Sequence, residues 1–149
     1  MATQIHKTLA ILGGLGTLVH AEHTAELACH LCEDGDTELV LAYVIVVPHS
    51  LPLDAPLLDQ ERAAQDAIDQ GLCVAHRRGC QVQARVVRHR HAAEAVLELA
   101  RAEGIDKIVL GVRVNLNVPH EYDTAETAET EILRSAKCEV IVDHEPVAA

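Results

Sequence analysis

Apolar residues follow two alternating patterns along this chain. Short, nearly continuous apolar runs rich in Val, Ile and Leu, such as 38–47 and 107–112, are typical of strands that are buried on both faces. Between such runs lie longer segments in which apolar residues recur every three or four positions, as Ala21, Ala25 and Ala28 do. This second period predicts amphipathic helices. We therefore expect a sheet of parallel strands that is covered by helices on both faces.

Five strands and four helices alternate in the predicted order. The expected strands are 6–13, 38–47, 82–87, 107–112 and 139–143, and the expected helices are 21–34, 58–78, 91–104 and 123–136. Prolines make the connection after the second strand extended. No internal repeat is evident, so residues 1–149 are expected to form a single domain. In such a sheet a ligand usually binds beyond the carboxyl ends of the strands, where the strand order reverses.

Composition narrows the classes of partner. The chain is 49% hydrophobic but only 1% aromatic, so its core must be aliphatic. It lacks the aromatic side chains on which unpaired bases stack, and its formal net charge of -11 repels a phosphate backbone. We expect no nucleic-acid partner.

No apolar stretch approaches the ~20 residues of a membrane span, and no signal peptide is recognised, so a cytoplasmic protein is expected.

The five cysteines point to reduced thiols, because their number is odd and no secretion signal accompanies them. Cys29 and Cys32 form a Cys-x-x-Cys pair near the C-terminal end of the predicted first helix, where the helix dipole opposes a thiolate. Three histidines nearby add zinc-ligand types, but these residues do not share one helix face. We therefore expect no metal, no cofactor and no redox chemistry.

Two further motifs carry weak signals. Gly-Gly-Leu-Gly at 13–16 lacks the rest of a phosphate-loop motif and is expected to form the turn after the first strand, beside Gly111. Arg88 and Arg90 precede a predicted helix and are either anion-attracting groups or part of a polar cap with His91. No Ser, Cys or carboxylate pair has the spacing of a catalytic set, so no enzymatic activity is expected.

Three stretches resemble the universal stress protein family. They are the strand–loop–helix–strand segment 86–111, the closing segment 132–143 and the proline-rich connection 48–59. The resemblance covers nearly the whole chain and implies a Rossmann-like or flavodoxin-like three-layer α/β fold, with an open five-stranded parallel sheet of order 3-2-1-4-5. It also implies a homodimer paired through the last strand. An unpaired apolar edge favours the same contact, through Val140, Ile141 and Val142.

One branch of that family binds ATP through a motif after the fourth strand: Gly-x-x-Gly, a longer spacer, then Gly and Ser or Thr. Gly111 matches the first glycine, whereas the second position is Val114 and the final pair is Glu126 and Thr127. The acidic residue that the family commonly has after the first strand is also missing. We therefore expect no ATP binding by this motif. The residues left as candidates for a nucleotide or other ligand are Gly13, Gly14, Val44, Gly111, Arg113 and Thr127.

The segment 112–118 has a strand period, because Val and Leu alternate with Arg and Asn. It is predicted to extend the fourth strand or to form a ribbon that contacts a protein partner.

Taken together, these features predict a non-enzymatic, dimeric stress-response protein with a regulatory or scaffolding role. The alternative is a nucleotide sensor with an altered switch-point site, for AMP, a cyclic nucleotide or ATP. A redox or metal protein built on Cys29 and Cys32 is a third hypothesis.

Overall fold

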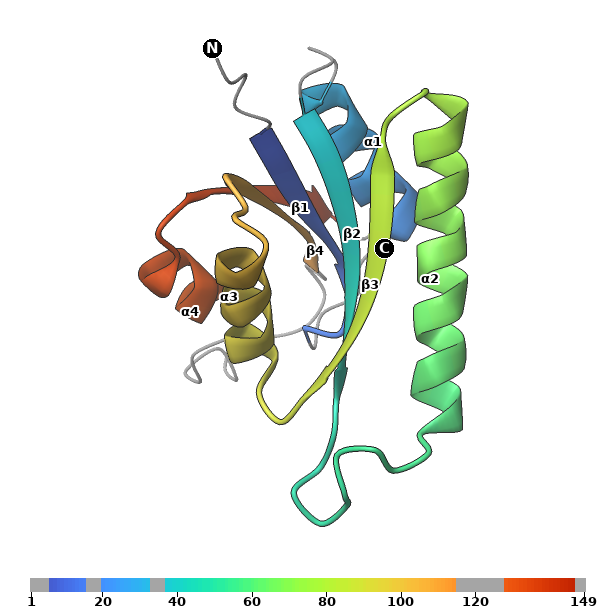
Figure 1. Cartoon of the computed structure of the whole chain (residues 1–149), viewed down its shortest axis with the longest axis vertical. Coiled ribbons are helices and arrows are strands. Elements are labelled where there is room, and N and C mark those ends of the chain that lie inside the picture. Colours follow the sequence, from blue (N-terminus) through green and yellow to red (C-terminus); the bar gives the residue numbers. More distant parts are fainter. Residues whose placement is uncertain (1–5, 16–19, 33–36, 115–127, 147–149) are drawn as a thin grey trace.

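The computed structural model describes residues 6–15, 20–32, 37–114 and 128–146 of this 149-residue chain (Figure 1). Strands and helices alternate along them. The elements are β1 (His6–Gly13), α1 (Ala21–Leu31), β2 (Thr37–Val46), α2 (Leu58–Arg77), β3 (Val82–His89), α3 (Ala92–Ala102), β4 (Lys107–Val114), α4 (Ala128–Ser135) and β5 (Glu139–Pro146). No helix within these ranges is both long enough and apolar enough to cross a membrane.

The five strands form one parallel sheet in the order β3-β2-β1-β4-β5, which confirms the predicted α/β fold. Figure 1 shows α1 and α2 on one face of the sheet and α3 and α4 on the other. Successive side chains of a strand point to opposite faces. Leu9 and Ile11 of β1 accordingly pack toward α3, whereas Ala10 and Leu12 pack toward α1 and α2.

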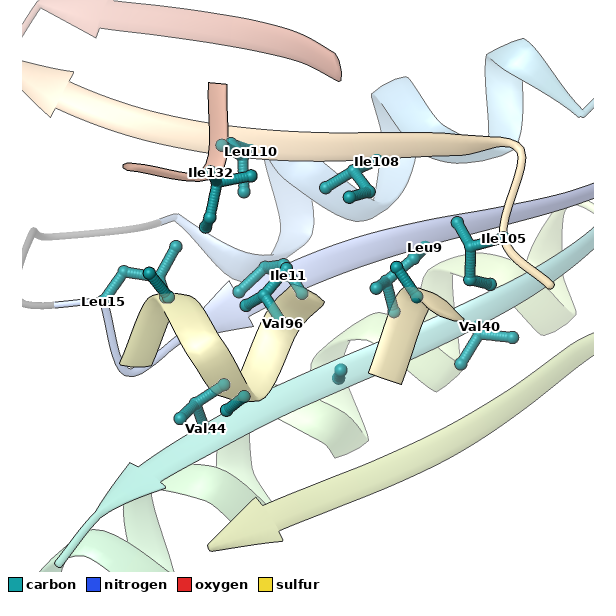
Figure 2. Close-up of a cluster of buried hydrophobic side chains, with 14 residues drawn as sticks. Leu9, Ile11, Leu15, Val40, Val44, Val96, Ile105, Ile108, Leu110 and Ile132 are labelled. Atoms are coloured by element: carbon teal, nitrogen blue, oxygen red, sulfur yellow. The ribbon is translucent and has the colours of Figure 1, made fainter. Parts of the chain in front are cut away.

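Each face of the sheet has its own aliphatic core, as the composition predicts. Figure 2 shows the core on the α3 side, in which Val96 of α3 and Ile132 of α4 cover the central strands. Ile108 and Leu110 of β4 also belong to this core and are fully buried. The central strands are therefore covered on both faces, which explains why β2 and β4 lack a polar face in the sequence.

Several elements end at other residues than predicted. Helix α1 ends at Leu31, three residues early, because Cys32 leaves helical geometry. Strand β4 continues to Val114, and its last residues pair with β5 as far as Pro146. The strand period of 112–118 is thus explained by a strand extension as far as Val114, and residues 115–118 lie outside the described ranges. The described part of the fourth helix begins at Ala128.

Two arginines hold the proline-rich connection after β2. The guanidinium group of Arg88 donates to the carbonyl oxygen of Ala55 at 2.9 Å and contacts Oε1 of Glu61 at 3.0 Å. That of Arg90 donates to the carbonyl oxygens of Pro48 and Leu51. These groups therefore satisfy the backbone of a loop, and the hypothesis that they attract an anion is not needed to explain them.

The turn after β1 depends on close contact between backbones. Gly14 has φ of +96°, a region that side chains with a Cβ rarely adopt, and a Cβ added there would lie 1.8 Å from the carbonyl oxygen of Val44. A Cβ added at Gly13 would lie 2.4 Å from the ring of Tyr43. The first strand can therefore turn against β2 only because both positions are glycine.

This contact predicts unequal costs for two glycine substitutions. Gly104, which follows α3, has φ of +64°, but a Cβ there would meet no atom within 4 Å. Gly104→Ala should therefore lower the free energy of unfolding by about 1 kcal/mol, through backbone strain alone. Gly14→Ala adds a clash with the backbone of β2 and should lower the free energy of unfolding by at least about 3 kcal/mol. Urea unfolding measures both, and equal losses would show that Gly14 is not in close contact with β2.

Candidate functional site

The strand order reverses between β1 and β4, since the chain adds β2 and β3 on one side of β1 and then β4 and β5 on the other. Beyond the carboxyl ends of these strands lies the position where a ligand is expected. Gly13 is the last residue of β1 and Gly14 follows it, whereas Gly111 lies near the end of β4. The structure thus brings three predicted glycines to the switch point of the sheet. Thr127 lies outside the described residues.

Val44, one of the candidate ligand residues, lies on β2 next to the turn after β1. Its side chain is buried in the core on the α3 side. Its carbonyl oxygen faces Gly14, at the distance where a single Cβ would clash. Tyr43 in turn lies against Gly13. The backbone of the first turn therefore occupies the space beside this carbonyl oxygen.

The three residues after Gly111 continue strand β4. Parallel pairing joins Gly111 to Asp143, Arg113 to Glu145 and Val114 to Pro146. On its other side, β4 pairs with β1 only from Lys107 to Leu110. A phosphate loop curls so that several consecutive N–H groups point at one anion, whereas the N–H groups of a strand alternate in direction. At Val112–Val114 the backbone is extended by its pairing with β5 and has this alternating arrangement.

An acidic side chain stands beside Gly111, and the sequence analysis did not predict it. Asp143, the register partner of Gly111, is half-buried, and its Oδ2 lies 2.5 Å from Nε2 of His23 on α1, without hydrogen-bond geometry. Asp143 therefore places a carboxylate and its histidine neighbour at this end of the sheet. Unit charges of the same sign about 4 Å apart repel by about 4 kcal/mol at an effective dielectric constant of about 20. Only the register of β5 against β4 could have revealed this position.

Among the described residues, one group of side chains has the spacing of metal ligands. The ligand atoms of His89, Glu94 and Glu98 all lie within 4.8 Å of one another. However, Nδ1 of His89 accepts the backbone N–H of His91 at 2.9 Å, so the proton of the neutral ring is on Nε2, 3.2 Å from Glu98. A metal bound at Nε2 would move that proton to Nδ1. There it would point at the backbone N–H of His91, and the hydrogen bond between the two residues would be lost. The arrangement favours a hydrogen-bonded start of α3 over a metal site.

The paired cysteines lie far from the switch point and belong to the core. Cys29 and Cys32 are both buried on the α1 side of the sheet, and Cys80 packs beside them. Burial, followed by a hydrogen bond with Cys80, raises the pKa of the Cys29 thiol to about 12. A thiol of this kind is a poor nucleophile and a poor metal ligand at neutral pH. The geometry therefore supports the interpretation of these cysteines as core residues.

Comparison with known proteins agrees with this architecture. Residues 10–144 match the model of the Universal stress protein family. A universal stress family protein from Burkholderia pseudomallei is similar at 23% identity, over 90% of this chain and 93% of that one, with a TM-score of 0.61. The universal stress protein from Archaeoglobus fulgidus, solved in complex with dAMP, is 10% identical over 93% and 98% of the two chains, with a TM-score of 0.66.

A third solved structure is a universal stress family protein from Arabidopsis thaliana with AMP bound, which is 10% identical over 93% of this chain and 91% of that one, with a TM-score of 0.55. No match was found among the curated proteins. The similarity of these structures concerns the fold, and the match to the family model extends over most of the sequence. The chain therefore belongs to the universal stress protein family.

Proposed function

We propose that this protein is a non-enzymatic, dimeric member of its family, with a regulatory or scaffolding role in the cytoplasm, and that it does not bind ATP by the usual motif. The observation that carries the proposal is the pairing of Val112–Val114 with β5. This pairing holds the backbone extended at the position where the family motif requires a glycine loop. The side chain of a Val at position 114 also adds bulk where a phosphate must come close to the backbone.

Charge at the switch point supports the same proposal. Asp143 lies in register with Gly111, and the sequence adds Glu126 at the position where the motif has its last glycine. ATP brings several negative charges to this end of the sheet and would need cations to offset both carboxylates. The candidate cation is Arg113, on β4 in register with Glu145, which is itself acidic.

The absence of an enzymatic role is part of the proposal. The residues gathered at the switch point are glycines, Val44 and the His23–Asp143 pair. A histidine–aspartate pair serves acyl transfer only when it activates a hydroxyl or thiol nucleophile. Among the residues that the structure describes, this set contains no Ser, Thr or Cys, and Cys29 and Cys32 lie in the core away from the carboxyl ends of the strands.

Binding of a nucleoside monophosphate is the second candidate function. One observation favours it: related structures carry dAMP or AMP, and this chain keeps glycines on β1 and β4 at the corresponding end of the sheet. AMP has one phosphate, so it meets less repulsion from Asp143 than ATP does. A cyclic nucleotide would meet still less. The two candidates differ in which nucleotide the purified protein retains.

Dimerisation through β5 is the third part of the proposal. Strand β5 is the edge of the sheet and pairs with β4 alone among the described strands. Val140 and Val142 pack toward the core on the α3 side, whereas Ile141 is half-buried on the opposite face. An edge strand of this length is a template for pairing with a second copy. A contact of segment 112–118 with a protein partner is also part of the proposal.

The ATP part of the proposal predicts weak binding. Three features oppose ATP: the strand at Val112–Val114, Asp143 beside Gly111, and the missing acidic residue after β1. If each costs about 1.4 kcal/mol and the costs add, affinity falls about a thousandfold, and a micromolar site becomes millimolar. Calorimetric titration with magnesium-ATP measures this, with AMP titrated in parallel. A dissociation constant for ATP near or below about 10 μM, with competition by ADP, would contradict the proposal.

The dimer contact predicts a difference between the two edges of the sheet. Ile141→Lys places a charge at the proposed interface and should weaken the dimer at least about tenfold. Val86→Lys is the matched control, because Val86 is exposed on β3 at the opposite edge. Light scattering over a range of concentrations reports the mass of each variant. A monomer at all concentrations in the unmodified protein would exclude this interface.

The raised pKa of Cys29 predicts slow thiol chemistry. At pH 8, well below a pKa of about 12, Cys29 should remain a thiol, whereas the exposed Cys73 should react first with N-ethylmaleimide. Mass spectrometry of the labelled peptides gives both rates in one sample. The redox or metal hypothesis returns if Cys29 reacts as fast as Cys73, or if the protein carries stoichiometric zinc that is lost in a Cys29→Ser variant.

A further inference from the structure

A hollow lies at the end of the sheet opposite the switch point. It is enclosed by the last turns of α3 and α4, which pack side by side on one face of the sheet (Figure 1), and by the first residues of β4 and β5. Its volume is about 350 Å³, within the range of small-molecule sites. The apolar part of its wall is formed by Leu97, Ala100, Ile105, Ile108, Ala136 and Cys138.

The polar part of the wall is entirely basic or neutral. Arg101 and Lys137 line the hollow together with Ser135, and no carboxylate is among the lining residues. The whole chain has 23 acidic side chains and 12 Lys and Arg, so a wall with two cations and no acid departs from the composition of the protein. The charged side chains that line the hollow are therefore cations in a protein of negative net charge.

Three acidic residues at this end of the sheet contact groups outside the hollow. Asp106 accepts the backbone N–H of Lys7 at 2.9 Å and lies 3.5 Å from His6. Glu103 contacts Arg85 at 2.8 Å, and Glu139 lies 4.0 Å from Lys107.

In contrast, neither of the two cations that line the hollow forms an ion pair within the ranges that the structure describes. Arg101 and Lys137 both have exposed side chains. They thus leave an uncompensated positive charge at the mouth of an apolar hollow. A partner that matches both features has an apolar body and one anionic group.

We propose that this hollow binds a small carboxylate with an apolar tail, such as a short- or medium-chain fatty acid. The tail would lie against Ile105, Ile108 and Leu97, and the carboxylate would accept hydrogen bonds from Arg101, Lys137 and the hydroxyl of Ser135. A nucleotide does not fit this description, because its base and sugar have many polar groups that the apolar wall would leave unpaired. The proposal is independent of the function proposed for the switch point.

Cys138 offers a reporter for the hollow. Its side chain is half-buried in the wall, and burial raises the pKa of its thiol. The Cys138 thiol should therefore react slowly with an alkylating reagent, and its rate should report mainly whether a ligand occupies the hollow. Cys73, exposed on α2 on the other face of the sheet, supplies an internal reference for reagent concentration and pH.

The test uses octanoate and octanamide, which have the same length but differ in charge. Octanoate titrated by calorimetry should bind, and octanamide should bind at least about tenfold more weakly, which corresponds to about 1.4 kcal/mol. In a variant with Arg101→Gln and Lys137→Gln, affinity for octanoate should fall by about the same factor while octanamide is unaffected. The matched control, Arg62→Gln with Arg77→Gln, removes the same charge from α2 and should leave both affinities unchanged.

Labelling locates the ligand. At an octanoate concentration about ten times the dissociation constant, modification of Cys138 by N-ethylmaleimide should slow by about tenfold, while modification of Cys73 keeps its rate. Ala136→Leu, which fills the hollow from within, should abolish both the binding heat and the protection in a variant whose urea unfolding stays cooperative. Absence of octanoate binding, binding equal to that of octanamide, or binding without protection of Cys138 each overturns the proposal.

Discussion

The pairing of β4 with β5 is the constraint on which the switch point of this protein depends. It runs in parallel register from Lys107 with Glu139 to Val114 with Pro146. This one ladder holds the edge strand in the sheet and keeps the backbone extended after Gly111. It also brings Asp143 beside Gly111. A chain that shortened β4 at Gly111 would free three residues to form a loop, but it would also free the end of β5. The extended backbone after Gly111 and the longer edge strand are therefore two consequences of the same pairing.

The aliphatic core explains how the sheet tolerates such a long edge. Leu9, Ile11, Ile108 and Leu110 fill one face of the two central strands, and burial of each of these side chains stabilises the fold by about 1.5–3 kcal/mol. The strands stay together through these contacts and not through aromatic packing. At Gly14, the backbone of the turn after β1 also lies close to the backbone of Val44 on β2. The same approach that makes the turn compact removes space beside the carbonyl oxygen of Val44.

The sequence predicted those features that depend on local periodicity. Buried runs such as 38–47 and helical stripes such as 91–104 determine the alternation of elements, and alternation of this kind permits few topologies. Features that depend on register were missed. Asp143 and His23 are 120 positions apart, and only the parallel pairing of β5 places one near the other. The use of Arg88 by a loop was missed for the same reason, since its carbonyl partner at Ala55 belongs to a different segment.

The last turns of α3 and α4 lie at the amino ends of the strands, because these helices run opposite to the strands that they cover. The carboxyl end carries Asp143, whereas the last turns of α3 and α4 bring Arg101 and Arg134 to the other end. Cations suit the negative end of a helix dipole and stabilise it by about 0.3–1 kcal/mol, so part of this distribution is explained by helix stability alone. The same dipoles oppose an anion in the hollow. A carboxylate there would need Arg101 and Lys137 to offset the repulsion from the C-terminal ends of both helices. The ratio of the affinities for a carboxylate and for the matching neutral amide therefore measures how much these two side chains contribute to anion binding beyond stabilising the helices.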